Sequence, residues 1–525
     1  MKVILIHPPF VDPSMPALGL AYLSNALERA SIDHRVVDAN LEFWQMSVFN
    51  NEIYPWSQQQ DDSPEMAYQY IGETLASILN DINNTYSDYF FSLDRCTIPN
   101  GWNDLYNIKD ISMDMNNPFN RWYVDTEFHT RICQDRPNVI GISVIFEAQL
   151  LPAICLARLL KACCPSVTII LGGALFSTFQ EYISEDTPFW DIVDGIIIGP
   201  GETALTGLVQ DNGRWRPAKN VKIFQSGSWL ADYSKVLDNL EGFPNFDCFP
   251  LKDYWAPGLV VPFRVLPSCS WNKCTFCADG RYAMGRKFSE TLRERIKNLS
   301  SLLDKHNARG VYFVDAELTP KVIQTIMDTF SSGQVAWGGN ARITSYLCQS
   351  KNTTKMYQSG CRLIRLGLES GSPNTLERMN KGIDLDLASK TIINLGKARI
   401  ATHVYLMKGF PFETEIEWQQ TIDFIKYHAQ WIDMVSISDF RLYEQSPIWR
   451  EMLKDKKVIS KATATYWEYP EMINSDKYLI EQQEVLDLIN FILDKRGGTR
   501  SCLTTAHTLL LSETFSYGLY SSGLK

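Results

Sequence analysis

Three cysteines lie close together in the segment Cys269-Ser-Trp-Asn-Lys-Cys274-Thr-Phe-Cys277, and an apolar, strand-like run at residues 260–266 leads into it. Three thiolates can hold three irons of a [4Fe–4S] cluster and leave the fourth iron open to a small molecule. A reductive enzyme that forms radicals needs such an open iron, whereas a site with four thiolates is closed to substrate. The spacing therefore predicts a cluster held by Cys269, Cys274 and Cys277.

A structural zinc site in the same loop is the main alternative, because zinc also binds thiolates. Such a site needs a fourth cysteine or histidine, and the candidates are few: Cys248 lies upstream, and His306 lies far downstream on a predicted helix. The lack of an obvious fourth partner favours the open cluster. Lys273 and Phe276, beside the thiols, are expected to tune the potential of the cluster and to exclude water.

Polar residues and glycines follow the predicted strands downstream of the thiols. They form four groups at successive strand ends: Asp315 and Glu317; Asn340 and Arg342; Glu369 and Ser370; and Met407, Gly409 and Pro411. Acids and an asparagine suit an amine and ribose hydroxyls, glycines let a nucleoside approach the backbone, and Arg342 could anchor a carboxylate. Any single acid is more often a helix cap, but four such groups together predict a binding edge.

The composition indicates the class of protein. The chain has 525 residues, of which 45% are hydrophobic, so two to four domains of roughly 100–200 residues are expected. A formal net charge of −10 argues against nucleic acid or an anionic membrane as a partner. The N-terminal apolar run is too short for a signal peptide, and no run reaches ~18 apolar residues, so a cytoplasmic protein without a membrane span is predicted.

The twelve cysteines fit a cytosolic protein better than a disulfide framework. Cys163 and Cys164, on a predicted helix, and the nearby Cys155 are interpreted as small buried hydrophobic residues. Only the group at residues 269–277 has the spacing of metal ligands.

The first 215 residues alternate predicted strands and helices. Strands are predicted at 2–7, 35–38, 139–144, 167–171 and 194–198, and helices at 18–30, at 149–162 and from Glu202. Such alternation is typical of an α/β fold with a parallel, doubly wound, Rossmann-like sheet. Ligands of these sheets bind at the carboxyl ends of the strands, where the glycines of this segment fall. Residues 41–138 are interpreted as an aromatic, largely helical insertion that caps this edge or elaborates the surface.

A second alternating series predicts a partial (β/α)6 barrel of the TIM type at residues 259–450. Its strands are predicted at 263–266, 311–314, 335–337, 363–368, 403–407 and 434–437, with helices at 292–306, 321–330, 387–398 and 415–428. In such barrels the chemistry collects at the carboxyl ends of the strands. Residues 216–258 are interpreted as a linker, and residues 451–525 as a small C-terminal domain that caps the substrate.

From about residue 260 to residue 450 the chain resembles a radical S-adenosylmethionine (radical SAM) enzyme. The thiol loop resembles the cluster motif of that superfamily, including Phe276 before the last cysteine, although the first spacing is one residue longer. Asp315-Ala-Glu317 is similar to its amine-binding motif. Its later barrel motifs are similar to Leu366-Gly-Leu-Glu369-Ser370-Gly371, Met379-Asn-Lys-Gly382 and Met407-Lys-Gly409-Phe-Pro411. The resemblance implies that S-adenosylmethionine binds at these segments.

The first domain resembles the cobalamin-binding domain that precedes the barrel in one class of these enzymes. The resemblance rests on His7-Pro-Pro9-Phe10, Pro16-Ala-Leu-Gly19, Gly141-Ile-Ser143, Leu171-Gly172-Gly173 and Ile198-Gly199-Pro-Gly201-Glu202. It implies cobalamin bound by Pro9, Gly19, Ser143, Gly172, Gly173, Gly199, Gly201 and Glu202. The Asp-x-His-x-x-Gly motif of other corrinoid proteins is absent, so no histidine on cobalt is expected, and His7 and His34 are interpreted as structural.

Together these resemblances imply a cobalamin-dependent radical SAM methyltransferase that acts on an unactivated carbon or phosphorus of a natural product, lipid or peptide. Reductive cleavage of S-adenosylmethionine would supply the radical, and methylcobalamin the methyl group. An electron donor such as flavodoxin or ferredoxin is implied, and Tyr282 and Tyr405 are candidate hydrogen or proton donors. Two alternatives stay open: the same cofactors without net methyl transfer, as in a radical cyclisation, ring contraction or oxidation, and a non-catalytic corrinoid or iron–sulfur sensor.

Overall fold

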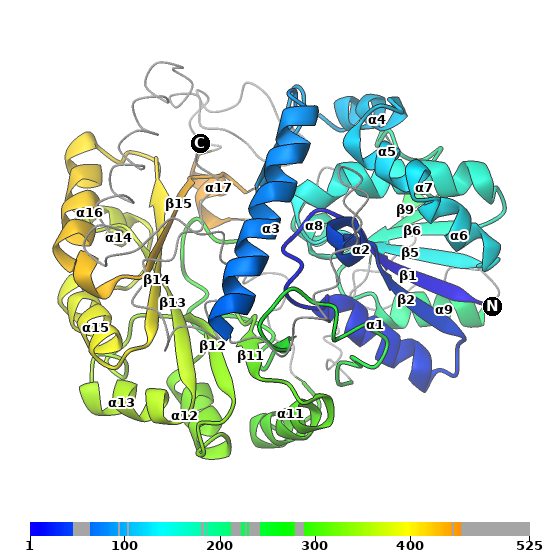
Figure 1. The fold of residues 1–525 in the computed structure, drawn as a ribbon. Coiled ribbons are helices and arrows are strands. Elements are labelled where there is room, and N and C mark those ends of the chain that lie inside the picture. Colours follow the sequence, from blue (N-terminus) through cyan, green and yellow to red (C-terminus); the bar gives the residue numbers. More distant parts are fainter. Residues whose placement is uncertain are drawn as a thin grey trace.

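The computed structural model describes residues 1–45, 64–92, 95–101, 104–179, 183–184, 186–211, 222–225, 228–229, 242–278, 288–443 and 446–452. Tyr282 and residues 453–525, which are nearly all of the predicted C-terminal domain, lie outside the described residues. The described chain forms two units, each built on a sheet of mainly parallel strands (Figure 1). None of the described helices has both the length and the apolar character that crossing a bilayer requires.

The first unit is built on a seven-stranded sheet with the order β2-β1-β5-β6-β7-β8-β9. Its strands are β1 (Val3–His7), β2 (His34–Asp38), β5 (Val139–Ser143), β6 (Thr168–Gly172), β7 (Gly195–Ile198), β8 (Lys222–Gln225) and β9 (Ser228–Trp229). The first five in the sheet are parallel, which confirms the predicted doubly wound arrangement, and β8 and β9 extend one edge antiparallel. These two strands lie in the segment interpreted as a linker, so the sheet continues beyond residue 215.

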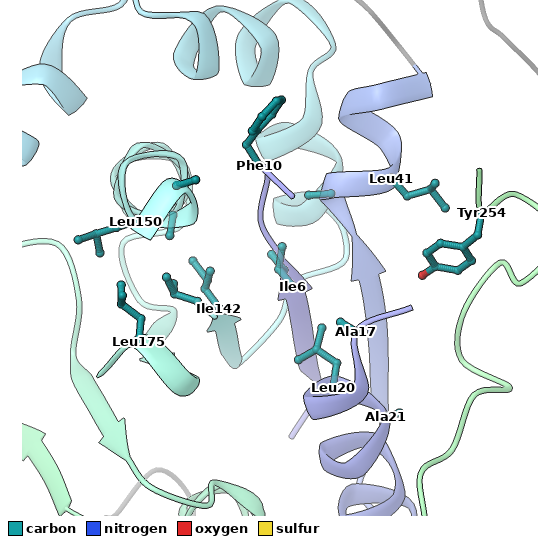
Figure 2. Packing of buried hydrophobic residues seen from close by; sticks show 14 of the residues in the cluster. Ile6, Phe10, Ala17, Leu20, Ala21, Leu41, Ile142, Leu150, Leu175 and Tyr254 are labelled. Atoms are coloured by element: carbon teal, nitrogen blue, oxygen red, sulfur yellow. The ribbon is translucent and has the colours of Figure 1, made fainter. Parts of the chain in front are cut away.

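Helices cover this sheet and bury its strands. They are α1 (Leu18–Arg29), α2 (Ala39–Gln45), α7 (Leu150–Cys163), α8 (Ala174–Thr178) and α9 (Glu202–Gln210), with the short 3-10 helix η2 (Glu147–Gln149). All five residues of β1 are buried, as expected for a parallel strand that is covered on both faces. Figure 2 shows Ile6 and Ile142 on neighbouring strands, with Leu20 of α1 and Leu150 of α7 packed around them.

The segment between β2 and β5 is largely helical. After α2 it contains α3 (Pro64–Thr85), the hairpin of β3 (Phe90–Ser92) and β4 (Arg95–Thr97), α4 (Leu105–Met113), α5 (Pro118–Asp125) and α6 (Phe128–Gln134). Its aromatic rings gather around Phe10, which follows β1: the centroids of Phe43, Trp44 and Phe91 lie 5.9, 4.8 and 5.2 Å from that of Phe10. These four rings are buried, so they fix this segment to the sheet by packing.

The second unit is a six-stranded sheet, parallel throughout, with the order β10-β11-β12-β13-β14-β15. Its strands are β10 (Val260–Phe263), β11 (Gly310–Phe313), β12 (Ala336–Ala341), β13 (Cys361–Glu369), β14 (Ala401–Lys408) and β15 (Met434–Asp439). Its helices are α11 (Leu292–His306), α12 (Pro320–Thr329), α13 (Ser350–Gln358), α14 (Pro373–Arg378), α15 (Leu385–Lys397), α16 (Glu415–His428), the 3-10 helix η4 (Ala429–Trp431) and α17 (Pro447–Met452). This arrangement confirms the predicted partial barrel (Figure 1).

Two helices of the barrel, α11 and α16, begin and end where the sequence predicts. A capping box marks the start of each. In α11 the hydroxyl of Thr291 accepts from the N–H of Glu294, whose side chain accepts from the Thr291 N–H. In α16 Thr414 and Glu417 make the same pair of bonds. Each box satisfies two backbone N–H groups that would otherwise be unpaired at the helix start.

Two strands differ from the predictions. β10 ends at Phe263, so residues 264–266 already belong to the following loop. β12 runs through Gly338 and Gly339 as far as Ala341, so Asn340 lies in the strand and not after it. At Gly339 a neighbouring strand leaves no room for a side chain, because a Cβ there would lie 2.8 Å from the carbonyl oxygen of Phe313.

Candidate active site

The three predicted cluster cysteines lie on one loop after the carboxyl end of β10. Cys269, Cys274 and Cys277 are all half-buried, and the N–H of Cys277 donates to the carbonyl of Cys274 at 3.3 Å. Thr275 ties the loop to the barrel, because its N–H donates to the carbonyl of Met379 at 2.9 Å and its hydroxyl to that of Arg378 at 3.0 Å. The loop is thus held in place while its thiols stay accessible.

Trp271, between the first two cysteines, packs against the segment that follows α14. Its indole N–H donates to the carbonyl of Asn380 at 2.8 Å. Gly382 has a φ of +65°, and a Cβ there would lie 2.4 Å from the Trp271 ring, so only glycine lets the ring approach this closely. The guanidinium of Arg342 lies 4.6 Å from the centre of the same ring and donates to the carbonyl of Lys381. Arg342 therefore supports the cluster loop.

The two acids after β11 have different partners. Asp315 is fully buried, and its carboxylate accepts hydrogen bonds from the N–H groups of Val265 and Leu266 at 3.0 and 2.5 Å. Glu317 accepts from the N–H and hydroxyl of Ser270 at 3.1 and 2.8 Å, and the Cys269 thiol lies 3.4 Å from the same carboxylate oxygen. Asp315 therefore shapes the start of the loop, whereas Glu317 contacts its first cysteine.

The burial of Asp315 makes a prediction about pH. Burial raises the pKa of its carboxyl group from 3.8 to about 6, although the backbone N–H groups oppose this shift. The unfolded chain loses this proton first as the pH rises, so the stability falls between about pH 4 and 6, by about 3 kcal/mol in total. Asp315→Asn cannot ionise and keeps an acceptor oxygen. Its free energy of unfolding relative to wild type should therefore rise by about 1 kcal/mol between pH 5 and 7.

Denaturant unfolding of the two proteins at several pH values measures this difference. The same change at exposed Asp386 in α15 is the control. An equal dependence on pH in Asp315→Asn and wild type would show that folding does not raise the pKa of Asp315.

Glu369 ends β13 and has a φ of +70°. The carboxylate forms an ion pair with Lys381 at 2.7 Å, and this ammonium group lies 5.6 Å from the centre of the Phe276 ring. The next residue, Ser370, is buried, and its hydroxyl lies 3.0 Å from that of Thr421 on α16. Glu369 is therefore placed toward the site, whereas Ser370 supports the fold behind it.

The remaining predicted barrel residues line the same edge. The amide of Asn340 donates to the backbone carbonyl of Asp315 at 2.8 Å. Met407 and Phe276 pack against one small hydrophobic cluster, formed around Met379 and Phe410. Gly409 has a φ of +73°, and its N–H donates to the carboxylate of Glu413 at 2.8 Å. Pro411 follows Phe410 and is buried.

The predicted cobalamin-binding residues follow the carboxyl ends of four neighbouring strands: Pro9 after β1, Ser143 at the end of β5, Gly172 and Gly173 at β6, and Gly199, Gly201 and Glu202 after β7. Gly173 has a φ of +110°, and a Cβ there would lie 2.3 Å from the carbonyl oxygen of Val144. The backbone at this position therefore requires glycine. Gly19 differs, because it lies exposed in α1 and a Cβ there would meet no atom within 4 Å.

His7 and His34, the two histidines of the first unit that could in principle reach a cobalt ion, have structural partners. His7, at the end of β1, is 3% exposed and lies 3.4 Å from the amide nitrogen of Gln149, and burial lowers its pKa. His34 contacts the carbonyl of Ile32 at 2.9 Å and the hydroxyl of Ser24 at 2.8 Å. These contacts agree with the structural role that the sequence indicates for both.

Contacts between the two units join the carboxyl edges of their sheets. Arg441, just after β15, forms an ion pair with Glu147, just after β5, at 3.1 Å. The rings of Phe179, after α8, and Tyr443 have centroids 6.0 Å apart. The loop with the three thiols and the glycine-rich edge of the first sheet are therefore on edges that face each other.

A group of polar side chains on the barrel strands contains Tyr405, which the sequence singled out, together with four residues that it did not. Arg365 of β13 donates to the hydroxyl of Tyr312 on β11 at 2.8 Å. His403, the partner of Arg365 in β14, contacts the hydroxyl of Ser436 at 2.8 Å, and its ring centroid lies 4.5 Å from that of Tyr405. Burial, with the nearby guanidinium, holds the pKa of His403 well below its usual value. A charged residue inside the apolar run at 363–368 was the available signal.

Comparison with known proteins finds a matching family model and similar proteins. The model of the Radical SAM superfamily matches residues 264–425. An uncharacterized methyltransferase from Pyrococcus horikoshii is 25% identical over 307 residues, which are 55% of this chain and 64% of that protein. Bacteriochlorophyllide d C-12(1)-methyltransferase from Chlorobaculum tepidum is 28% identical over 203 residues, 38% of this chain and 43% of that protein. The chain thus spans less than two thirds of the length of these relatives.

Two solved structures share the fold of both units. The radical S-adenosylmethionine methyltransferase TsrM from Kitasatospora setae, solved with cobalamin and a [4Fe–4S] cluster, has a TM-score of 0.56 at 14% identity and covers 88% of this chain and 79% of its own. The cobalamin-dependent S-adenosylmethionine radical enzyme OxsB has a TM-score of 0.55 at 13% identity and covers 98% and 74%. Residues 264–425, which the model of the Radical SAM superfamily matches, begin just before the three-cysteine loop and end within α16.

Proposed function

We propose that this chain is a cobalamin-dependent radical SAM methyltransferase. Cys269, Cys274 and Cys277 would hold a [4Fe–4S] cluster that binds S-adenosylmethionine, and the glycine-rich edge of the first sheet would hold a corrinoid. The observation that carries the proposal is the ion pair between Glu147 and Arg441, which joins the two carboxyl edges. When bound, these cofactors supply the radical and the methyl group, while the protein provides orientation and excludes water.

The spacing of the loop thiols supports a cluster over a single zinc ion. A single ion with bonds of ~2.3 Å to sulfur needs thiolates about 4 Å apart. In the described part of the chain, Cys269, Cys274 and Cys277 do not form a group whose sulfur atoms all lie within 4.8 Å of one another. A cluster places its thiolates on separate irons, so it suits the wider spacing.

The first sheet suits a large planar ligand that approaches its backbone. Gly173 and Gly199 adopt positive φ values at the carboxyl edge and present no side chain. His7 and His34 are engaged in contacts within the fold, so a corrinoid here would have no ligand from either histidine. TsrM was solved with cobalamin bound, and the shared fold supports the same cofactor here.

Polar side chains on the barrel strands β11, β13 and β14 support a small organic substrate. Tyr312, Arg365 and Tyr405 offer two hydroxyls and a guanidinium, which together suit a ligand with an anionic or hydrogen-bond-accepting group. TsrM was also solved with its substrate tryptophan, a molecule with such a carboxylate. We propose a small molecule of this kind, methylated at carbon, with flavodoxin or ferredoxin as the electron donor.

A second candidate is a reaction with the same cofactors and no net methyl transfer. One relative is named an anaerobic magnesium-protoporphyrin IX monomethyl ester cyclase, from Rubrivivax gelatinosus, and is 21% identical over 57% of this chain. The mass of the product separates the two, because a methyl group that replaces a hydrogen adds about 14 Da.

Anaerobic reconstitution with iron, sulfide and hydroxocobalamin tests the proposal. We expect about four irons and one corrinoid per chain, and turnover of S-adenosylmethionine when a reductant is added. Transfer of the methyl group of labelled S-adenosylmethionine to the bound corrinoid would support a methyltransferase. Zinc in the cysteine loop, or intact S-adenosylmethionine after reduction, would contradict the proposal.

Gly173→Ala should abolish corrinoid binding while iron binding persists. Alanine at a φ of +110°, with its Cβ 2.3 Å from a backbone oxygen, forces the turn at the end of β6 to move. The readout is corrinoid and iron per chain after reconstitution. Gly207→Ala in α9 is the matched control, since no atom lies within 4 Å of its Cβ position. Equal corrinoid retention in both variants would remove this edge from the proposed site.

A further inference from the structure

Three cysteines outside the candidate active site lie together in the first unit. Cys133 lies on α6, Cys163 ends α7, and Cys164 is the C-cap residue of α7. Their sulfur atoms all lie within 4.8 Å of one another, the one such group of metal-binding side chains among the residues that the structure describes. The interpretation of Cys163 as buried is wrong, because Cys163 is exposed. The structure also brings together a second group of three thiols, besides the loop at 269–277 whose spacing the sequence shows. Cys155, in contrast, is buried as expected.

The spacing of these thiols suits a single ion. Metal–sulfur bonds of ~2.3 Å place the thiolates around one ion about 4 Å apart, so small rotations of the side chains would complete the site. Soft thiolate ligands without carboxylates select zinc-like or softer ions over magnesium or calcium. Cys133 is buried, Cys164 is half-buried and Cys163 is exposed, so an ion can enter from the solvent side and keep one position for water.

We propose that Cys133, Cys163 and Cys164 form a zinc site that is separate from the candidate active site. The ion would join α6, from the segment between β2 and β5, to the end of α7, which packs on the first sheet. The two helices already contact each other, and the Cys164 thiol lies 3.9 Å from the carbonyl oxygen of Cys133. In Figure 1, α6 lies at the edge of the first unit that is remote from the barrel. The site would therefore stabilise this helix pair and take no part in the chemistry.

Zinc retention by the full chain tests this site. The protein with its cluster reconstituted is incubated anaerobically with one equivalent of Zn²⁺, desalted, and analysed for zinc and iron. We expect wild type to keep one zinc per chain, and Cys163→Ser and Cys133→Ser to keep none, with iron unchanged. Cys163 is exposed, so its variant should fold even where Cys133→Ser does not. Cys348→Ser, which changes a half-buried cysteine in the turn between β12 and α13, should keep the zinc.

Alkylation gives a second readout that does not depend on the cluster. Bound zinc should protect Cys163 from iodoacetamide in wild type, as measured by mass spectrometry of the peptides, and excess chelator should remove the protection. Zinc retained by both Cys163→Ser and Cys133→Ser, or none retained by wild type, would overturn the site. A disulfide between two of these cysteines in the anaerobic protein would overturn it as well, in favour of a redox pair.

Discussion

Cys274→Ala is expected to abolish the reductive cleavage of S-adenosylmethionine by the reconstituted protein. Two thiolates hold only two irons of a cube, so the cluster should not survive reconstitution, and no open iron would remain to bind the substrate. We expect iron to fall from about four atoms per chain to a small residue, and product formation to fall below detection. The measurement is iron per chain, together with chromatography of the nucleoside products.

The same variant tests whether the two cofactor sites are separate. The glycine-rich edge belongs to the first sheet and contains no residue of the cysteine loop, so corrinoid retention by Cys274→Ala should equal that of wild type. Cys348→Ala is the matched control and should keep both cofactors. Loss of corrinoid together with the cluster would show that the two units do not bind their cofactors independently.

Arg295→Met should uncouple the two units and lower methyl transfer by about 10²-fold. Arg295 of α11 is 1% exposed, and its guanidinium contacts the Tyr22 hydroxyl of α1, in the first unit. It also pairs with Glu290 at 3.1 Å and lies 4.9 and 3.5 Å from the ring centres of Phe263 and Phe288. Removing it leaves its half-buried partners, Tyr22 and Glu290, unpaired, at about 2–4 kcal/mol of stability.

The positions of the two sheets explain why Arg295→Met should lower the rate of methyl transfer more than the rate of S-adenosylmethionine cleavage. Cleavage depends on the cysteine loop and the barrel, whereas methyl transfer also depends on the distance to the first unit. The readouts are labelled methyl transfer to the corrinoid, nucleoside products and thermal unfolding. Arg293→Met, an exposed change two residues away on the same helix, is the control. An equal loss of both activities in Arg295→Met would indicate damage to the barrel and not to the contact between units.

The elements and the order of the two domains were predictable because they depend on local patterns. Apolar runs of four to six residues alternate with segments of helical periodicity, and the capping boxes at Thr291 and Thr414 mark helix starts in the sequence itself. The cysteine spacing likewise lies within nine residues, so its chemistry could be inferred directly. Strand ends were less predictable: β12 continues through Gly338 and Gly339, and β11 lies too close to Gly339 for a side chain there.

The sequence by itself determined a three-thiol loop after a strand, two series of parallel strands, and acids and glycines at their ends. Only the tertiary structure decided which of these groups meet. Trp271 packs on Gly382, Glu317 reaches Cys269, and Cys133 lies beside Cys163. The physical reason is that these contacts join residues far apart in the chain. Their distances depend on how helices and strands pack, and no local pattern of residues records that packing.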